Sequence, residues 1–194
     1  MHHFIVKLAR FMALLGGLVL IALIVMTCAS ILARSMTTIS NAEWLTSQFP
    51  SISAFLINSG IGPINGDYEI LEAGVAFAIF AFLPICQLRG GHAAVEVFTG
   101  FLPARFNQAL IAFWEIMLAL AIVLISWRLS AGLLSKINNG ETSFLLQFPI
   151  WWSYAASFAA SVMAAVVAVY CAWSRTKSAI TGQPDLIGLE GGAH

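Results

Sequence analysis

Few side chains in this sequence could do acid–base or metal chemistry, and most of them lie in or beside long apolar segments. The three cysteines form no CxxC pair, and the four histidines (positions 2, 3, 92 and 194) are not spaced as metal ligands. No nucleophile stands near a base at catalytic spacing, and no glycine-rich loop of the phosphate-binding type occurs. The sequence therefore predicts neither an enzyme nor a metal centre, and no cofactor is expected in this chain.

Two carboxylates lie within apolar segments. Glu72 is just inside one end of the second segment, where its carboxylate can reach water. Glu115 lies about nine residues into the third segment, or about 13 Å along a helix. A carboxylate at that depth is costly and usually has a partner. We therefore favour a structural or inter-subunit ion pair, for which Arg89 is one possible base. A proton-relay acid and simple interfacial solvation remain the alternatives.

Composition shows which elements must position these residues. Of 194 residues, 60% are hydrophobic and only 9% are charged, with a net charge of zero. Soluble domains carry about 25% charged residues, so a soluble enzyme, a disordered chain and a nucleic-acid-binding protein are excluded. Four apolar segments are long enough to cross a bilayer as helices: 11–33, 70–88, 106–127 and 148–173. We predict an all-α integral membrane protein, with a four-helix transmembrane domain over 1–175 and a short cytoplasmic tail over 176–194.

The distribution of basic residues predicts the orientation. With the N-terminus inside, the cytoplasmic side holds six basic residues and the outer side three. The six are Lys7, Arg10, Arg89, Arg105, Arg175 and Lys177, and the three are Arg34, Arg128 and Lys136. Because Lys and Arg are enriched in cytoplasmic loops, both termini are predicted to be cytoplasmic.

Two connections have features of their own. In the long outer loop over 34–69, Ser40 and Glu43 have the spacing of a helix capping box, which predicts short helices there. Such helices could lie on the membrane surface or form a docking surface for a partner protein. Between the second and third spans, the apolar residues 93–102 predict an interfacial segment.

The fourth span carries a row of small residues at every fourth position. These are Ala156, Ala160, Ala164 and Ala168. Helices in lipid associate through close backbone approach, which small residues permit. The row therefore predicts a helix-packing seam, either within this chain's own bundle or against another subunit.

Two stretches in this order resemble the small membrane subunit, or Q-type small permease, of the tripartite ATP-independent periplasmic (TRAP) transporters. The first is GDYEILEAGVAFAIFAFLPICQLRGGHAAVEVF, whose matching residues are Arg89, Gly91, His92, Val95 and Glu96. The second is ETSFLLQFPIWWSY, whose matching residues are Thr142, Leu146, Pro149, Trp151 and Tyr154. Together with the four spans, the resemblance covers about residues 11–175. The expected subunit interface consists of eight residues: Arg89, Gly91, His92, Val95, Glu96, Glu115, Trp151 and Tyr154.

The resemblance implies a function and partners. A periplasmic binding protein would deliver an organic acid, such as a C4-dicarboxylate, to a large M-type membrane subunit that transports it by symport, usually with sodium. This chain would scaffold that large subunit in the bacterial inner membrane, in contact with lipids, and the sodium would bind in the large subunit. The alternative is a stand-alone homo-oligomeric exporter that uses Glu72 or Glu115 as its coupling acid. A haem-binding anchor is disfavoured because no span carries axial histidines.

Overall fold

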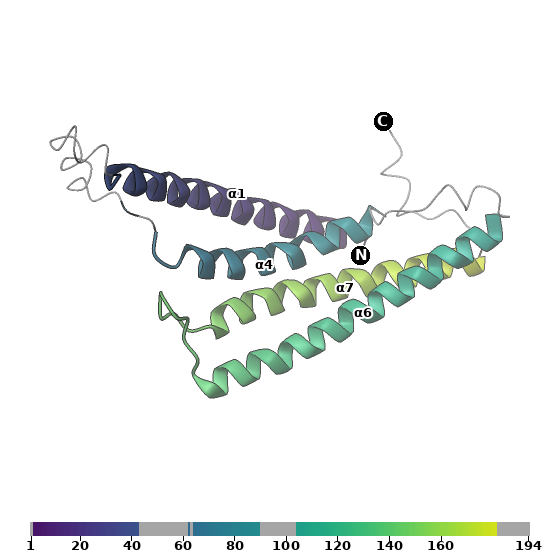
Figure 1. Cartoon of the computed structure of the whole chain (residues 1–194). Helices are drawn as coiled ribbons and strands as arrows, with labels where there is room; N and C mark the ends of the chain where they lie inside the picture. Colours follow the sequence, from purple (N-terminus) through teal and green to yellow (C-terminus); the bar gives the residue numbers. More distant parts are fainter. Residues whose placement is uncertain (1, 43–61, 63, 90–103, 182–194) are drawn as a thin grey trace.

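The computed structural model describes residues 2–42, 62, 64–89 and 104–181. Its elements are four helices: α1 (His2–Ser40), α4 (Asp67–Leu88), α6 (Ala104–Asn139) and α7 (Trp151–Thr181) (Figure 1). Within the described residues there is no β-strand, only an isolated bridge between Thr142 and Pro149. All four helices are long and apolar enough to cross a membrane. The predicted all-α membrane fold is confirmed.

All four helices are longer than the apolar segments that the sequence indicates, α4 by the least. α1 has 39 residues, α6 has 36 and α7 has 31, whereas α4 has only 22. In α1 the helix continues through a polar stretch, in which Thr37 Oγ1 donates to the carbonyl of Ala33 and Thr38 Oγ1 to that of Arg34, both at 2.9 Å. Such bonds to the carbonyl four residues earlier satisfy the threonine hydroxyls within the helix. Hydropathy therefore indicates which part of a helix spans the membrane, but not where the helix begins and ends.

The helices pack as two pairs joined through α7. α1 packs on α4, α6 packs on α7, and α4 packs on α7. We call the end that holds Ser40, Asp67 and residues 140–150 the hairpin end, and the opposite end the N-terminal end. The two pairs lie close together at the N-terminal end and diverge towards the hairpin end (Figure 1).

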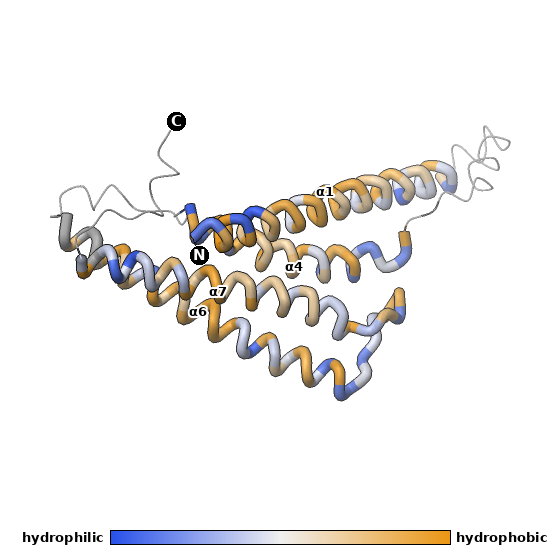
Figure 2. The backbone as a smooth tube through the Cα atoms, turned by 180° about the vertical axis from the view of Figure 1, so that it is seen from behind, coloured by the Kyte–Doolittle hydropathy of each residue, from blue (hydrophilic) through white to orange (hydrophobic). Residues whose placement is uncertain are grey.

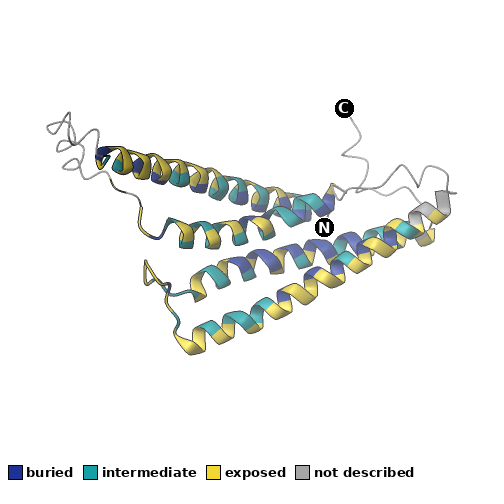
Figure 3. Ribbon diagram, viewed as in Figure 1, coloured by how far each residue is buried: buried dark blue, intermediate teal, exposed yellow. Residues whose placement is uncertain are grey.

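Small residues make up most of the buried core between the helices. In α7, Ala160, Ala164 and Ala168 are almost completely buried, and the last two pack on Ala119 and Ile122 of α6. At the level of Ala160 the core continues onto Met12 and Ala81, which come from α1 and α4. Small side chains let backbones approach closely, which in lipid is a main source of helix association. Figure 3 shows burial concentrated along α7, which is the central helix.

The outer surface of the bundle is apolar. Large side chains such as Leu14, Leu18 and Ile21 of α1 are more than half exposed. Hydrophobic residues predominate along most of the length of the helices (Figure 2). A surface of this kind fits hydrocarbon and not water.

Some predictions fall outside the described residues. The short helices of the outer loop fall on residues 43–61, and the interfacial segment on residues 93–102. The orientation in the membrane, with both termini cytoplasmic, also stays a prediction.

Candidate functional site

A buried polar cluster joins three helices near the N-terminal end. Glu115 of α6 is only 5% exposed. Its Oε1 lies 2.7 Å from Nη1 of Arg175 in α7, and its Oε2 accepts a hydrogen bond of 2.7 Å from Nε2 of Gln87 in α4. The carboxylate is therefore held by a charge on one side and an amide on the other. This arrangement satisfies a buried anion within the chain.

The cluster identifies the partner of Glu115. The base is Arg175, and not Arg89, which is exposed at the C-cap of α4. Arg175 lies beyond the predicted end of the fourth span, but α7 continues to Thr181 and carries it as part of the helix. Since both carboxylate oxygens are engaged by residues of other helices, the geometry fits a structural link between helices better than a proton-relay acid.

A hairpin connects α6 to α7 at the other end of the bundle. The amide of Ser143 donates to the carbonyl of Phe148 at 2.9 Å, and that of Ile150 donates to Glu141 at 3.1 Å. Lys136 of α6 forms an ion pair with Glu141 at the start of the hairpin. The Lys136 ammonium lowers the pKa of the Glu141 carboxyl, and the amide of Asn139 adds to this effect.

Glu69 of α4 fastens this hairpin to the first helix pair. Its carboxylate accepts the amide of Leu145 at 2.7 Å and that of Leu146 at 3.0 Å. Beside it, Gly66 has φ of 80°, and a Cβ at this position would overlap the side chain of Leu146. Only a glycine fits both the backbone conformation and the close approach. Glu69 therefore acts as a latch between α4 and the hairpin.

The start of α4 is also tied to α1. Ser30 Oγ donates to Asp67 Oδ2 at 2.6 Å, and Arg34 lies 3.4 Å from the same oxygen. The Arg34 guanidinium also lies over the ring of Tyr68. The basic residue predicted to flank the first span is thus paired with an acid of the next helix.

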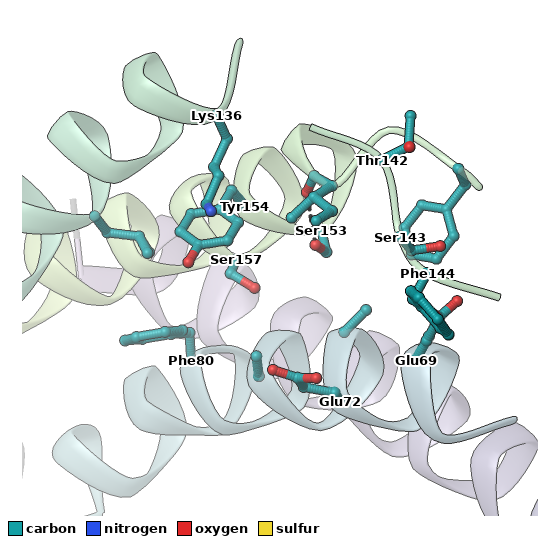
Figure 4. A pocket seen from close by; sticks show the side chains of 15 residues that line it. Glu69, Glu72, Phe80, Lys136, Thr142, Ser143, Phe144, Ser153, Tyr154 and Ser157 are labelled. Atoms are coloured by element: carbon teal, nitrogen blue, oxygen red, sulfur yellow. Dashed lines mark hydrogen bonds between the residues drawn. The ribbon is translucent and has the colours of Figure 1, made fainter. Parts of the chain in front are cut away.

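A cavity of about 570 Å³ opens between α4 and the second helix pair at the hairpin end. Its lining includes Glu69, Glu72 and Phe80 of α4, together with Lys136, Tyr154 and Ser157. Figure 4 shows the Glu72 carboxylate and the Ser157 hydroxyl directed from opposite helices into the space between them. The cavity is amphipathic, with carboxylates and hydroxyls set among apolar walls.

The predicted site residues are distributed over both ends. Tyr154 lines the cavity, whereas the neighbouring Trp151 is exposed at the start of α7. Three residues of the alanine row are buried in this chain's own bundle, but Ala156 is exposed where the helix pairs diverge. Four motif residues lie outside the described residues: Gly91, His92, Val95 and Glu96.

Sequence reasoning missed Gln87, Glu69 and Arg175 as partners in these networks. Gln87 is almost completely buried although it is polar, and it is the only amide side chain of α4. A lone amide in a membrane span is a usable signal, because it needs a hydrogen-bond partner there. Glu69 gives no such signal, since its role depends on a hairpin 76 residues away.

Comparison with known families decides what kind of protein carries these two sites. The family described as tripartite ATP-independent periplasmic transporters, DctQ component, matches residues 52–178. The chain belongs to this family. No curated protein and no solved structure matches it. The matched range includes the hairpin, the cavity and the Glu115 cluster, whereas α1 precedes it.

Membership gives the coarse function. The chain is the small membrane subunit of a TRAP transporter. Its family is a family of transporter components and not a class of enzymes. With four helices able to span a bilayer, it is a multi-pass membrane protein. Among the described residues, no group of three or more His, Cys, Asp or Glu side chains could hold a metal ion.

Proposed function

We propose that this subunit scaffolds the large TRAP membrane subunit, which carries out ion-coupled uptake of an organic acid. The substrate would be a carboxylate such as a C4-dicarboxylate, delivered by a periplasmic binding protein. The coupling sodium would bind in the large subunit. The chain would lie in the bacterial inner membrane with both termini in the cytoplasm, so that the hairpin end faces the periplasm.

The observation that carries this proposal is the Glu115 cluster. A coupling acid must release and take up a proton or an ion during transport. Glu115 instead has both oxygens engaged, by Arg175 and by Gln87, and these contacts tie α4, α6 and α7 together. A network that fixes three helices suits a rigid support. It disfavours the exporter alternative that uses Glu115.

The apolar packing supports the same proposal. The described helices meet through alanines and small aliphatic residues, and their outward faces present large apolar side chains. Transport sites at the middle of a membrane usually show ionisable groups or broken helices. The four described helices have neither a break nor a free ionisable group at mid-membrane depth. Such a bundle offers surface to a neighbour rather than a path to a substrate.

Reconstitution in proteoliposomes tests the proposal. Uptake of labelled C4-dicarboxylate, driven by a sodium gradient, is expected only when the large subunit, this chain and the binding protein are all present. This chain alone should give no uptake and no efflux. Transport by this chain alone would overturn the scaffold role and support the homo-oligomeric exporter.

A further inference from the structure

The cavity at the hairpin end contains an acid placed at membrane depth. α4 has 22 residues and is therefore about 33 Å long, close to the roughly 30 Å of the hydrocarbon layer. Glu72 lies five residues after the first residue of α4, or about 7.5 Å along the helix. Glu72 thus lies near the edge of the apolar layer, two residues inside the predicted span 70–88, where a cation or hydrogen-bond donors stabilise a carboxylate.

The cavity has an excess of negative charge. Of its two carboxylates, Glu69 is engaged by the amides of Leu145 and Leu146. The ammonium of Lys136 is paired with Glu141. Within the described residues, the Glu72 carboxylate has no hydrogen bond and no ion pair. The charge of Glu72 is therefore the uncompensated one.

This chain has no basic residue to spare for Glu72. All nine Lys and Arg residues lie in the ranges 7–89 and 105–177, and segments 43–61, 90–103 and 182–194 contain none. At the hairpin end, Arg34 pairs with Asp67, and Lys136 pairs with Glu141. Arg128 is exposed on α6 and does not line the cavity. Among the described residues that line the cavity, none is therefore left as a counter-cation for Glu72, which leaves room for one from another molecule.

The opposite wall offers a second polar group. Ser157 of α7 is only 4% exposed, and its Oγ has no hydrogen-bond partner within the described part of the chain. A buried hydroxyl without a partner is uncommon and marks a place for one. It faces the same space as the Glu72 carboxylate (Figure 4).

The shape of the cavity indicates what kind of cation it admits. Phe80 and Leu129 provide apolar walls, and a volume of about 570 Å³ exceeds that of a bare ion. Lysine and arginine combine an aliphatic stem with a charged head that donates hydrogen bonds. The hairpin residues Ser143, Phe144 and Phe148 also line the cavity.

We propose that this cavity receives a lysine or arginine side chain from a membrane helix of the large TRAP subunit. Glu72 is the counter-ion, and Ser157 Oγ accepts a further hydrogen bond from the same cation. This inference rests on the proposed function, since it supplies a contact through which the scaffold holds the transporter. A second alkylammonium source, a lipid headgroup, would place no demand on the large subunit, and the experiment separates the two.

Co-purification measures the contact. The tagged chain is co-expressed with the large subunit, and the ratio of the two is measured after affinity purification in mild detergent. Glu72→Gln should reduce recovery of the large subunit by about tenfold, and Glu72→Lys should reduce it further. Glu72→Asp should retain part of it. Arg128→Gln, which removes an exposed charge outside the cavity, is the matched control and should have no effect.

A charge reversal identifies the partner residue. Replacing the relevant Lys or Arg of the large subunit with Glu should restore the recovery that Glu72→Lys abolishes. A photo-crosslinking residue in place of Phe80 should then cross-link to the same helix of the large subunit, whereas one in place of Leu18 on α1 should not. Circular dichroism and size-exclusion profiles of each variant show that the bundle remains folded.

The outcomes are distinct. If the wild-type chain recovers the large subunit and Glu72→Gln recovers as much, the inference is overturned while the scaffold role stands. Cross-linking from position 80 only to lipid, or only to residues 43–61 of this chain, overturns it as well. If the wild-type chain recovers no large subunit, the proposed function itself fails.

Discussion

Each end of the bundle has a carboxylate within an apolar helix, and the two carboxylates differ in whether they have a partner. At the N-terminal end, Glu115 is closed in by Arg175 and Gln87 from two other helices. At the hairpin end, Glu72 points into an open cavity, and its charge is not compensated within the described residues. The first acid holds the chain together. The second is available to a neighbour.

This difference shows why burial must be considered together with pairing. Judged by depth along the helix alone, Glu115 is the stronger candidate for a functional role, because it lies further from the end of its span. The structure shows the opposite. A carboxylate whose oxygens are already engaged within the chain is not available to bind another molecule. The acid nearer the surface is the one with unused capacity.

Disrupting the Glu115 cluster at the N-terminal end should have the largest effect on stability. Glu115→Ala would remove the carboxylate that pairs with the half-buried Arg175 and accepts from Gln87, and the expected loss of stability is up to about 3–5 kcal/mol. The double variant Glu115→Leu with Arg175→Met should recover a large part of this loss. Thermal unfolding in detergent, followed by tryptophan fluorescence, measures both. The sequence alone makes a related prediction, that Glu115→Gln harms assembly rather than the pH dependence of transport.

A control variant makes this result specific. Arg128→Gln removes an exposed charge of the same helix and should change the midpoint of unfolding very little. If it destabilised the chain as much as Glu115→Ala does, the buried pair would have no special role.

The alanine row should respond to enlargement according to position. Ala164 and Ala168 are packed against α6, so Ala164→Leu would force the helices apart at a cost of about 1–3 kcal/mol. Ala156 is exposed where the helix pairs diverge, and Ala156→Leu should change stability by less than about 0.5 kcal/mol. Equal effects in the same unfolding assay would mean that the pairs do not separate.

The latch at the hairpin end should be sensitive to one methyl group. Gly66→Ala combines a left-handed backbone conformation with an overlap on Leu146 and should cost about 1–2 kcal/mol or more. Gly140 also has positive φ, but a Cβ there would have nothing within 4 Å, so Gly140→Ala carries the conformational cost alone. Hydrogen exchange at the amides of Leu145 and Leu146 should rise more in the first variant than in the second. The reverse order would show that Gly66 is not close to the hairpin.

The smallest expected effect is a pH dependence of the hairpin. The pKa of Glu141 is lowered in the folded chain by Lys136, so this contribution to stability is present above the ordinary value of 4.5. It is lost as the pH falls through the lowered folded value. Exchange at the amides of Ser143 and Ile150 should therefore increase on acidification below about pH 4.5. Glu141→Gln should remove this dependence, and an unchanged profile in that variant would rule out the pair as its source.

The sequence predicts the helices better than the networks between them. The four spans follow from apolar length alone, since a chain in lipid must satisfy its backbone by forming helices. The small-residue row likewise identifies a face of α7 that packs closely. The ends of α1 and α6 could not be predicted in this way, because hydrogen bonds and not hydropathy decide where a helix stops.

The two sites depend on contacts between separate helices, which the hydrophobic pattern of the sequence does not specify. Glu115 and Arg175 come from separate helices, and their pairing follows from how α6 and α7 cross. The cavity depends on the divergence of the two helix pairs, which hydrophobic spacing does not encode. The pairing of Arg34 with Asp67 likewise depends on how α1 and α4 pack.

The divergence of the two helix pairs also has a consequence for the membrane itself. A bundle that is narrow at one end and wide at the other occupies more area in one leaflet than in the opposite one. Lipids around such an inclusion must tilt or stretch to follow its sides, which costs free energy in a flat bilayer. A neighbouring helix that fills the wider end makes the outline more nearly cylindrical and relieves this deformation. The shape of the bundle thus favours association before any specific contact is made.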